Sequence, residues 1–540
     1  MPQLDVIIIG GDKPLEVLGE DVRDRSRLHV DGMPASLPFL REYFLAGRDA
    51  SAAAAALRRQ PPSLALNGPY LCRFLEDRGF TSRWIPLLAT HEKEFLAAIE
   101  ERPRAVVIST TFLPFAAEID RMARWIKDRA DDVPVIAGGI QVWKSYQHRL
   151  RFEAGDITPD IAEELGAHNY LIDATRPSPV DLLVISERGE ETLAKILAAL
   201  RDGCDAKAVE NVAYFAGGKW RISRVVREPY HEVSVDWSEI VPGGMRQYVP
   251  VQAGQGCGFR CAFCDFSGLR SPRSRPVDSI IREIGTIPEV DGERRVYFTD
   301  DNLFADRRRA RSLCQALIDS GCDVQWRGMV RLPVLDEEIT DLMARSGCRE
   351  VLLGIESGDP GILRAMGKAM SPDDILSRVR LLNGKGIHTK NTFIVGYPGE
   401  TARSLRNTVE LLNAYPVDGP AGHRHLFFTF AVLPLSRVAS PESRAAYGLR
   451  GYGFRWKHNT MSSHEAARHL AWVQEAIKPE LSPNYMLEVP DIEGVRSEDI
   501  KEVYLLRNLI AGRRRSPGER GVQESLWDRL EAVFRHPTST

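Results

Sequence analysis

Short apolar runs alternate with amphipathic stretches along the first 205 residues. The apolar runs cover 4–9, 105–109, 135–139 and 181–186, and stretches of helical periodicity cover 91–101, 116–129 and 190–200. Apolar, β-branched runs of this length are typical of buried parallel strands. Their alternation with helices predicts a doubly wound, Rossmann-like α/β domain over residues 1–205.

A second alternation begins near residue 247. It predicts strands at 247–253, 294–299, 323–329, 349–355, 387–395 and 426–433, and helices at 276–287, 306–320, 336–346, 372–385 and 402–414. Six strands with helices between them predict a partial (β/α)6 barrel of the TIM type over residues 246–439, with its chemistry at the carboxyl ends of the strands.

The remaining segments are assigned by turn signals and helix caps. Residues 206–245 predict a linker with a small strand pair around the glycine turn 217–218. Residues 440–540 predict a mostly helical region in which Ser463 caps a helix that runs to Ile477. A further helix is predicted at 497–511, and the alanine-rich run 51–56 predicts another near the N-terminus.

Composition narrows the class of protein. The 540 residues are 43% hydrophobic and 27% charged with a net charge of −3, which is ordinary for a soluble globular protein and gives no overall field for nucleic acid. There is no run of 18 apolar residues, so no membrane span is expected. The N-terminus carries Asp5 and lacks the basic start of a signal peptide. Eight cysteines, three of them clustered, suit a reducing cytosol, so a cytoplasmic protein is expected.

The three clustered cysteines are the strongest chemical signal. Cys257, Cys261 and Cys264 have the spacing C-x3-C-x2-C in a glycine-flanked loop. Thiolates favour zinc, copper(I) or an iron–sulfur cluster. Structural zinc needs a fourth ligand, and no Cys or His follows within the loop. Three thiolates on a four-iron cluster would leave one iron open to another ligand. Spacing alone leaves open a zinc site closed by a distant residue, or unrelated cysteines.

The flanking sequence is more specific. With Phe263 just before the last cysteine, the motif resembles the radical S-adenosylmethionine (radical SAM) superfamily, and the resemblance continues downstream in Val296–Asn302, Leu353–Gly358 and Phe393–Thr401. It implies a [4Fe-4S] cluster on the three cysteines, which binds S-adenosylmethionine and cleaves it to a 5′-deoxyadenosyl radical. It also implies an external one-electron reductant such as flavodoxin or ferredoxin.

The resemblance also suggests how S-adenosylmethionine is held. Its methionyl amine would lie at Asp300, Asp301 and Asn302, although such residues also serve as helix N-caps. Its carboxylate would pair with Arg331 or Arg327, for which a surface role is equally consistent. The ribose hydroxyls would meet Glu356 and Ser357, and the adenine would lie beside Gly396 and Tyr397.

The first domain resembles the cobalamin-binding domain that precedes the barrel in one radical SAM subfamily. The matching segments are Val106–Thr111, Val135–Gly139 and Ile185–Thr192. The motif D-x-H-x-x-G, which supplies a histidine below the cobalt, is absent, so the resemblance implies cobalamin without a histidine ligand. The candidate cofactor residues at the strand ends are Ser109, Thr110, Thr111, Gly138, Gly139 and Glu187. Ordinary strand-to-helix turns are the alternative.

Together these resemblances imply a cobalamin-dependent radical SAM methyltransferase. It would act on an unactivated carbon of a small-molecule or peptide substrate, through the 5′-deoxyadenosyl radical and methylcobalamin. The alternatives are a cyclase or rearrangement enzyme with the same cofactors, a cobalamin-free radical SAM enzyme, and a non-enzymatic cobalamin-responsive protein. Tyr452, Trp456 and His458, in a glycine-rich aromatic segment, are predicted to close over the substrate. The alternative is that they pack the C-terminal helices onto the barrel.

Overall fold

The computed structural model describes residues 4–11, 29–30, 33–34, 37–59, 64–113, 115–166, 169–243, 245, 247–266, 269–368, 370–481, 499–513 and 520–535. The chain divides into two compact units. The first comprises Met1–Val17, Pro62–Asp236 and Gly268–Arg270, and the second comprises Leu18–Pro61, Trp237–Ser267 and Ser271–Thr540. The division therefore differs from the predicted boundary at residue 205.

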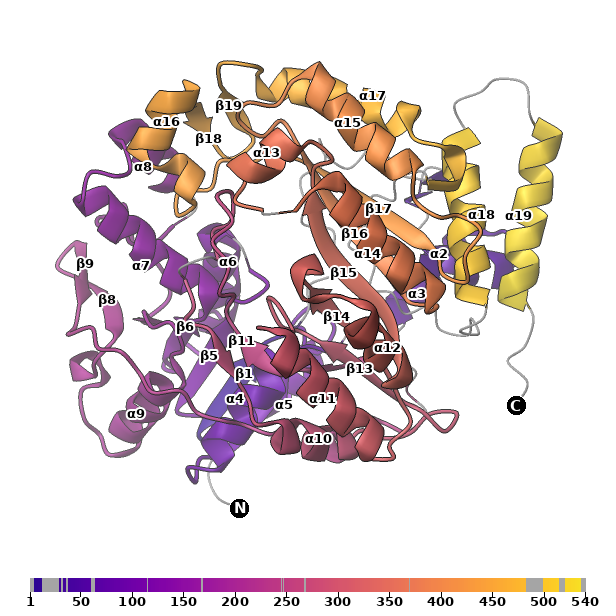
Figure 1. The fold of residues 1–540 in the computed structure, drawn as a ribbon. Helices are drawn as coiled ribbons and strands as arrows, with labels where there is room; N and C mark the ends of the chain where they lie inside the picture. The colour runs from indigo at the N-terminus through magenta and orange to yellow at the C-terminus, as the bar shows by residue number, and fades with distance from the viewer. Residues whose placement is uncertain are drawn as a thin grey trace. The chain divides into compact units, whose positions relative to one another are not determined.

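The first unit is built on one seven-stranded sheet. Its parallel strands are β1 (Val6–Ile9), β4 (Ser82–Ile85), β5 (Ala105–Ser109), β6 (Val135–Gly138) and β7 (Leu182–Val184). β8 (Val212–Ala216) and β9 (Lys219–Ile222) follow in antiparallel fashion, giving the order β4-β1-β5-β6-β7-β8-β9. The strand pair predicted within a linker thus forms the edge of this sheet (Figure 1).

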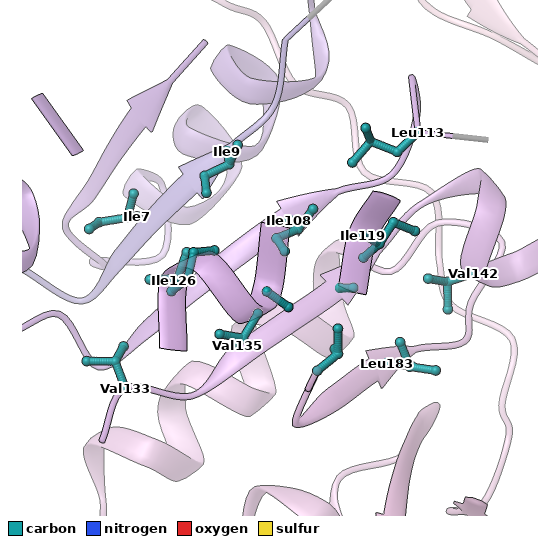
Figure 2. Close-up of a cluster of buried hydrophobic side chains, with 14 of the residues drawn as sticks. Ile7, Ile9, Ile108, Leu113, Ile119, Ile126, Val133, Val135, Val142 and Leu183 are labelled. Atoms are coloured by element: carbon teal, nitrogen blue, oxygen red, sulfur yellow. The ribbon is translucent and has the colours of Figure 1, made fainter. Parts of the chain in front are cut away.

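The helices of the first unit are α4 (Asn67–Glu76), α5 (Glu92–Glu100), α6 (Ala116–Lys127), α7 (Ile140–Glu153), α8 (Pro159–Gly166) and α9 (Glu190–Arg201). Successive strand side chains point to opposite faces, so the sheet has two cores. Ile7 and Ile108 pack with Ile119 of α6 on one face (Figure 2), whereas Ile8 and Val107 pack with Leu193 of α9 on the other. The doubly wound prediction is confirmed.

The strand order determines where a ligand can bind to this sheet. β1 lies between β4 and β5, and β4 is the next of the parallel strands along the chain after β1. This is the flavodoxin-like order, whose switch point lies between β1 and β5. Ligands of such sheets bind outside the carboxyl ends of the strands at the switch point. The residues after β1 and β5 are therefore the candidate ligand contacts of the first unit.

The second unit contains a six-stranded, fully parallel sheet in sequential order. Its strands are β10 (Val249–Val251), β13 (Arg294–Phe298), β14 (Val324–Val330), β15 (Cys348–Glu356), β16 (His388–Val395) and β17 (His423–Thr429). The helices between them are α10 (Val277–Gly285), α11 (Arg307–Asp319), α12 (Glu337–Arg345), α13 (Pro360–Ala365), α14 (Pro372–Gly384) and α15 (Ala402–Asn413). The partial barrel is confirmed. β17 begins three residues before its prediction, and α13 was not predicted.

The helices of the barrel begin where the sequence supplies a capping side chain. The Asp306 carboxylate accepts from Arg309 N–H at the start of α11, and the Asp336 carboxylate accepts from Ile339 N–H at the start of α12. Ser371 and Thr401 form reciprocal capping boxes at α14 and α15. Such caps satisfy amide groups that have no partner within the helix, which fixes the starting residue.

The C-terminal region is mostly helical, as predicted. It contains α16 (Pro441–Tyr447), the hairpin β18 (Arg450–Tyr452) and β19 (Arg455–Lys457), α17 (Ser463–Ala476), α18 (Ile500–Arg513) and α19 (Arg520–Arg535). The residue that caps α17 is Ser462 rather than Ser463, because Ser462 forms a capping box with Glu465. No described helix is both long and apolar enough to cross a membrane.

An N-terminal helical hairpin also belongs to the second unit. α2 (Leu37–Leu45) and α3 (Ala50–Arg59) share one hydrophobic core with α18 and α19, in which Phe44 stacks on Phe534. Arg48 adds an ion pair to Glu531 at 2.6 Å. The prediction that this stretch is part of the first domain is wrong, because its apolar faces are covered by the C-terminal helices (Figure 1). The remaining short strands are β2 (His29–Val30), β3 (Met33–Pro34), β11 (Gly254–Gln255) and β12 (Arg273–Ser274).

Candidate functional site

The cysteine loop follows β10 and β11 at the carboxyl end of the first barrel strand. Cys261 is buried and 6% exposed, whereas Cys257 and Cys264 are half-buried, and all three are free thiols. Ala262 anchors the loop, because its N–H donates to Met366 O at 2.8 Å and its carbonyl accepts from Val438 N–H at 2.8 Å. The three cysteines are therefore presented from one loop that is held by two other segments of the barrel.

Arg331, at the end of β14, lies directly against this loop. Its Nη1 donates to Cys261 Sγ at 3.0 Å, and its guanidinium stacks 3.9 Å from the centre of the Phe259 ring. Burial raises the pKa of the Cys257 thiol, and the positive charge of Arg331 acts in the opposite direction. A cation beside these sulfurs favours the thiolate form, which is the form that binds metal. Across the described residues, no group of three His, Cys, Asp or Glu side chains is placed to hold a single metal ion.

The segment Asp300–Asn302 supports the same loop from the end of β13. Asp300 Oδ2 accepts from Ala253 N–H at 2.9 Å, and Asp301 Oδ2 accepts from Gly256 N–H at 3.0 Å. Burial raises the pKa of Asp300 to about 7. Asn302 donates to Phe304 O at 2.8 Å, while its buried Oδ1 has no hydrogen-bond partner among the described residues. None of the three caps α11, which begins at Arg307 and is capped by Asp306.

Glu356 and Ser357 differ in how much hydrogen-bonding capacity their side chains keep for a ligand. Glu356 is buried with φ +73°, a left-handed conformation that is uncommon outside glycine. Its carboxylate accepts from Thr392 Oγ1 at 3.1 Å. Ser357 is fully buried, and its hydroxyl accepts from Asp359 N–H at 3.1 Å and lies 3.4 Å from Thr408 Oγ1. Both side chains are therefore engaged with the chain, but the carboxylate of Glu356 has more acceptor sites than the hydroxyl of Ser357 and keeps capacity for a ligand.

Lys368 is a buried cation of this region that the sequence motifs did not indicate. It follows α13, and its Nζ lies 3.4 Å from Glu356 Oε1 and donates to Gly354 O. It also lies 5.9 Å from the centre of the Phe263 ring in the cysteine loop. A lysine three residues past a short helix gives no local signal, because its position is recognised only from its contacts with β15 and with the cysteine loop.

The Gly396–Tyr397 turn is held on both sides. Gly396 N–H donates to Glu400 Oε2 at 2.5 Å, and its carbonyl lies 3.0 Å from Nε2 of His458. Burial raises the pKa of Glu400 to about 8. Gly396 has φ +95°, and a Cβ there would meet the Trp456 ring at 2.6 Å, so no other residue fits. Tyr397 is buried and donates to Ala365 O at 3.0 Å.

The aromatic residues predicted to contact substrate lie on or after the β18–β19 hairpin. Trp456 and His458 are 5% and 2% exposed and stack in parallel at 4.9 Å. The Trp456 indole donates to Phe430 O at 2.7 Å, and Nδ1 of His458 faces Thr460 Oγ1 at 3.1 Å. With both imidazole nitrogens bonded to the chain, His458 is placed to position Gly396. Tyr452 is half-buried on the hairpin.

Arg327 is buried, so the surface role considered for it is wrong. Its guanidinium stacks 3.3 Å from the centre of the Tyr248 ring, midway along β14. Nearby, Arg424 binds both oxygens of Glu350 at 2.6 Å. Burial alone would raise the pKa of Glu350, but the charges of Arg424 and Arg327 outweigh it and lower that pKa to about 2. Arg327 therefore belongs to an ionic cluster in the sheet interior, whereas Arg331 is at the strand end.

In the first unit, polar groups gather at the switch point between β1 and β5. Asn67 Nδ2 donates to Ser109 Oγ at 2.7 Å, and Ser109 Oγ lies 3.3 Å from Thr111 Oγ1. The Oδ1 of Asn67 is buried without a hydrogen-bond partner among the described residues. Thr110 is fully buried and donates to Gly138 O at 2.9 Å, so its hydroxyl is engaged with the chain. Gly139 has φ +112°, which favours glycine.

The turn after β7 is organised by Glu228, which sequence reasoning missed. Its buried carboxylate accepts from Gly189 N–H at 2.7 Å, from Thr192 N–H and Oγ1 at 2.6 Å each, and from the Ser186 hydroxyl. Glu187 is half-buried on this turn, beside Arg188. The Glu228 carboxylate caps the start of α9, but Glu228 lies 36 or more positions along the chain from the residues that it binds. No local sequence pattern therefore identifies it.

Comparison with protein families supports this description. Residues 251–412 match the model of the Radical SAM superfamily, which covers the cysteine loop and the strands to α15. The second unit therefore carries a radical SAM domain, and the resemblance stated from the sequence is confirmed for this domain.

The individual relatives include a methyltransferase and a cyclase. The chain is 28% identical over 255 residues to an uncharacterised methyltransferase of Pyrococcus horikoshii, covering 45% of this chain and 55% of the relative. It is 25% identical over 285 residues to the anaerobic magnesium-protoporphyrin IX monomethyl ester cyclase of Rubrivivax gelatinosus, covering 49% and 51%. The chain thus spans about half the length of the curated relatives it matches.

A solved structure extends the likeness to the whole fold. The radical S-adenosylmethionine methyltransferase TsrM from Kitasatospora setae, with cobalamin and a [4Fe-4S] cluster bound, aligns with a TM-score of 0.53 at 17% identity. The alignment covers 81% of this chain and 77% of that chain. At this identity the likeness shows a shared fold, in which a Rossmann-like unit and a radical SAM barrel occur in one chain.

Proposed function

We propose that this protein is a cobalamin-dependent radical SAM methyltransferase. The observation that carries the proposal is the cysteine loop at the mouth of the partial barrel, with the Arg331 guanidinium 3.0 Å from Cys261 Sγ. When bound, a [4Fe-4S] cluster with S-adenosylmethionine would supply a 5′-deoxyadenosyl radical, and cobalamin would carry the methyl group. An external flavodoxin or ferredoxin would supply electrons.

The thiolates of Cys257, Cys261 and Cys264 would hold the cluster. The free Oδ1 of Asn302 and the carboxylate of Glu356 would accept hydrogen bonds from S-adenosylmethionine. Asp300 and Asp301 would act through the backbone, because each holds an amide of the segment that leads into the cysteine loop. The Gly396–Tyr397 turn would provide a backbone surface for the adenine, kept in place by Glu400 and His458.

Cobalamin would lie on the first unit at the switch point. The unpaired Oδ1 of Asn67 and the hydroxyls of Ser109 and Thr111 supply polar contacts there. Gly138 and Gly139 would let the ligand approach the backbone, and Glu187 would add a carboxylate on the turn after β7. Thr110 would position this edge through its bond to Gly138 O. No protein histidine would bind the cobalt from below.

The substrate would be a small molecule or peptide with an unactivated carbon. Tyr452, half-buried on the β18–β19 hairpin, remains a candidate contact, whereas His458 would position Gly396 and Trp456 would pack beside it. A second candidate function is a radical cyclase with the same cofactors, which is favoured by the match to the Rubrivivax gelatinosus cyclase.

The two functions differ in what becomes of S-adenosylmethionine. Transfer of its methyl group to cobalamin leaves S-adenosylhomocysteine, whereas radical cleavage alone leaves 5′-deoxyadenosine and methionine. The test is a single-turnover incubation of the anaerobically reduced protein, loaded with cluster and cobalamin. We expect S-adenosylhomocysteine in proportion to bound corrinoid, and none in protein loaded with cluster only. Formation of 5′-deoxyadenosine without any S-adenosylhomocysteine would contradict methyl transfer and favour the cyclase.

A further inference from the structure

Three exposed arginines surround the cysteine loop on the second unit. Arg260 lies within the loop itself, Arg364 is in the last turn of α13, and Arg437 begins the short 3-10 turn Arg437–Ala439. We call these three residues the arginine surface. No ion pair to a carboxylate is recorded for any of them within the described residues, in contrast to Arg311 on α11, which pairs with Glu338 at 2.8 Å.

Backbone contacts hold the three arginines around the same short stretch of chain. Arg437 Nη1 donates to Arg260 O at 3.2 Å, and the next residue, Val438, donates to Ala262 O at 2.8 Å. On the other side, the segment after Arg364 approaches the loop, since Ala262 N–H donates to Met366 O at 2.8 Å. A Cβ on Gly367 would lie 3.1 Å from Arg260 O, so this approach is as close as a glycine allows.

The backbone contacts thus keep the arginine surface next to the loop that carries the three cysteines. Cys261 follows Arg260 directly in the chain, and Cys257 and Cys264 in the same loop are only half-buried. Electron transfer slows steeply with distance, so a redox partner placed here would have a short path to the cysteines.

We propose that the arginine surface is the docking site of an acidic one-electron carrier protein, of the flavodoxin or ferredoxin class. This inference rests on the proposed function, because it presumes a cluster on Cys257, Cys261 and Cys264. The reduced carrier gives up one electron and the cluster takes up one, so the exchange balances without a proton or a further reagent. Complementary charge steers such encounters and sets their orientation. The chain as a whole carries a net charge of −3, so the attraction arises from this local patch.

The test measures binding of a bacterial flavodoxin to the full chain loaded with cluster, by anaerobic titration calorimetry at low and high salt. The variant combines Arg260→Glu with Arg364→Glu, whose side chains make no recorded bond within the described residues, so the loop keeps its contacts. We expect Kd to rise about tenfold or more at low salt, because two positive charges become negative, and we expect the difference to shrink at high salt.

The matched control is Arg380→Glu on α14. Arg380 is exposed in the second half of its helix, near the opposite end of the barrel from the strand ends that bear the cysteine loop. We expect this variant to bind flavodoxin as the native protein does. Iron content, and cleavage of S-adenosylmethionine driven by dithionite, should be retained in both variants, because dithionite needs no docking surface.

The outcomes are distinguishable. If the native protein holds a cluster and the Arg260→Glu, Arg364→Glu variant binds flavodoxin with unchanged Kd, the docking inference is wrong while the proposed function stands. If the native protein holds no cluster, the proposed function fails. If the arginine surface instead governs binding of a short DNA or RNA duplex and not of flavodoxin, the surface has a different partner and the inference is overturned.

Discussion

The Nη1 of Arg331 lies 3.0 Å from the Sγ of Cys261, although the two residues are 70 positions apart in the chain. The contact joins the end of β14 to the cysteine loop and places a permanent positive charge against a buried sulfur. The stack of the same guanidinium on Phe259 fixes its orientation. The sequence motifs identified both residues, but they assigned Arg331 to the carboxylate of S-adenosylmethionine and did not indicate its contact with Cys261.

Replacing Arg331 with Met should weaken the hold on cluster iron. Methionine keeps much of the bulk over Phe259 and removes the charge beside Cys261. A hydrogen bond that involves a charged group contributes about 1.5–3 kcal/mol, so we expect iron to be lost to a chelator at least about tenfold more readily. Arg331→Lys should restore part of the effect. Iron retention equal to that of the native protein in Arg331→Met would show that the contact is incidental.

Glu228→Gln should destabilise the first unit and reduce its retention of cobalamin. The carboxylate accepts from three residues of the β7–α9 turn, and an amide would turn a donor toward groups that are themselves donors. We expect a loss of about 1–3 kcal/mol, seen as a lower midpoint of thermal unfolding. Glu232→Gln, an exposed change four residues away, is the control. Equal midpoints of thermal unfolding for the two variants would show that the Glu228 carboxylate does not stabilise the first unit.

His458→Ala distinguishes positioning from substrate contact. The imidazole holds Gly396 O at 3.0 Å, so its loss should weaken binding of S-adenosylmethionine by about tenfold while cluster iron is retained. Phe454→Ala, at a position 58% exposed between β18 and β19, should bind it normally. Should His458→Ala bind S-adenosylmethionine normally and lose only product formation, the substrate role predicted from the sequence would be favoured instead.

Glu400 should make stability depend on pH in a definite direction. Burial raises its pKa from 4.5 to about 8, so the folded state keeps a proton that the unfolded chain releases. Its contribution is therefore complete below about pH 4.5 and is lost as the pH rises to about 8. Glu400→Gln keeps an acceptor for Gly396 N–H and cannot ionise. We expect the native protein to lose more stability between pH 5 and 8 than this variant does, measured as urea midpoints. Equal losses in the two proteins would contradict the raised pKa.

Whether the sequence could predict a feature depends on how far apart along the chain its interacting residues lie. The strands of both sheets and the cysteine spacing are encoded within a few residues, and the predicted strands agree with the structure. The predicted helix cap Ser463 differs from the observed cap, Ser462, by one position. Glu228, Lys368 and Asn67 act through residues 14 to 42 positions away, so no local pattern identifies them. The packing partner of a helix is equally absent from the local sequence. The alanine run 51–56 predicted α3, whereas α2 was not predicted, and neither helix could be assigned to α18 and α19.

The central claim is that one chain holds an iron–sulfur cluster on its barrel and cobalamin on its Rossmann-like unit, through separate residues. The most direct measurement is the iron and corrinoid content of the full chain after anaerobic reconstitution, compared with the variant in which Cys257, Cys261 and Cys264 are alanine. We expect about four irons per native chain, as in a [4Fe-4S] cluster, and one bound corrinoid. The triple variant should lose the iron and keep the corrinoid. Retention of cluster iron by the triple variant, or absence of corrinoid from the native protein, would contradict the account.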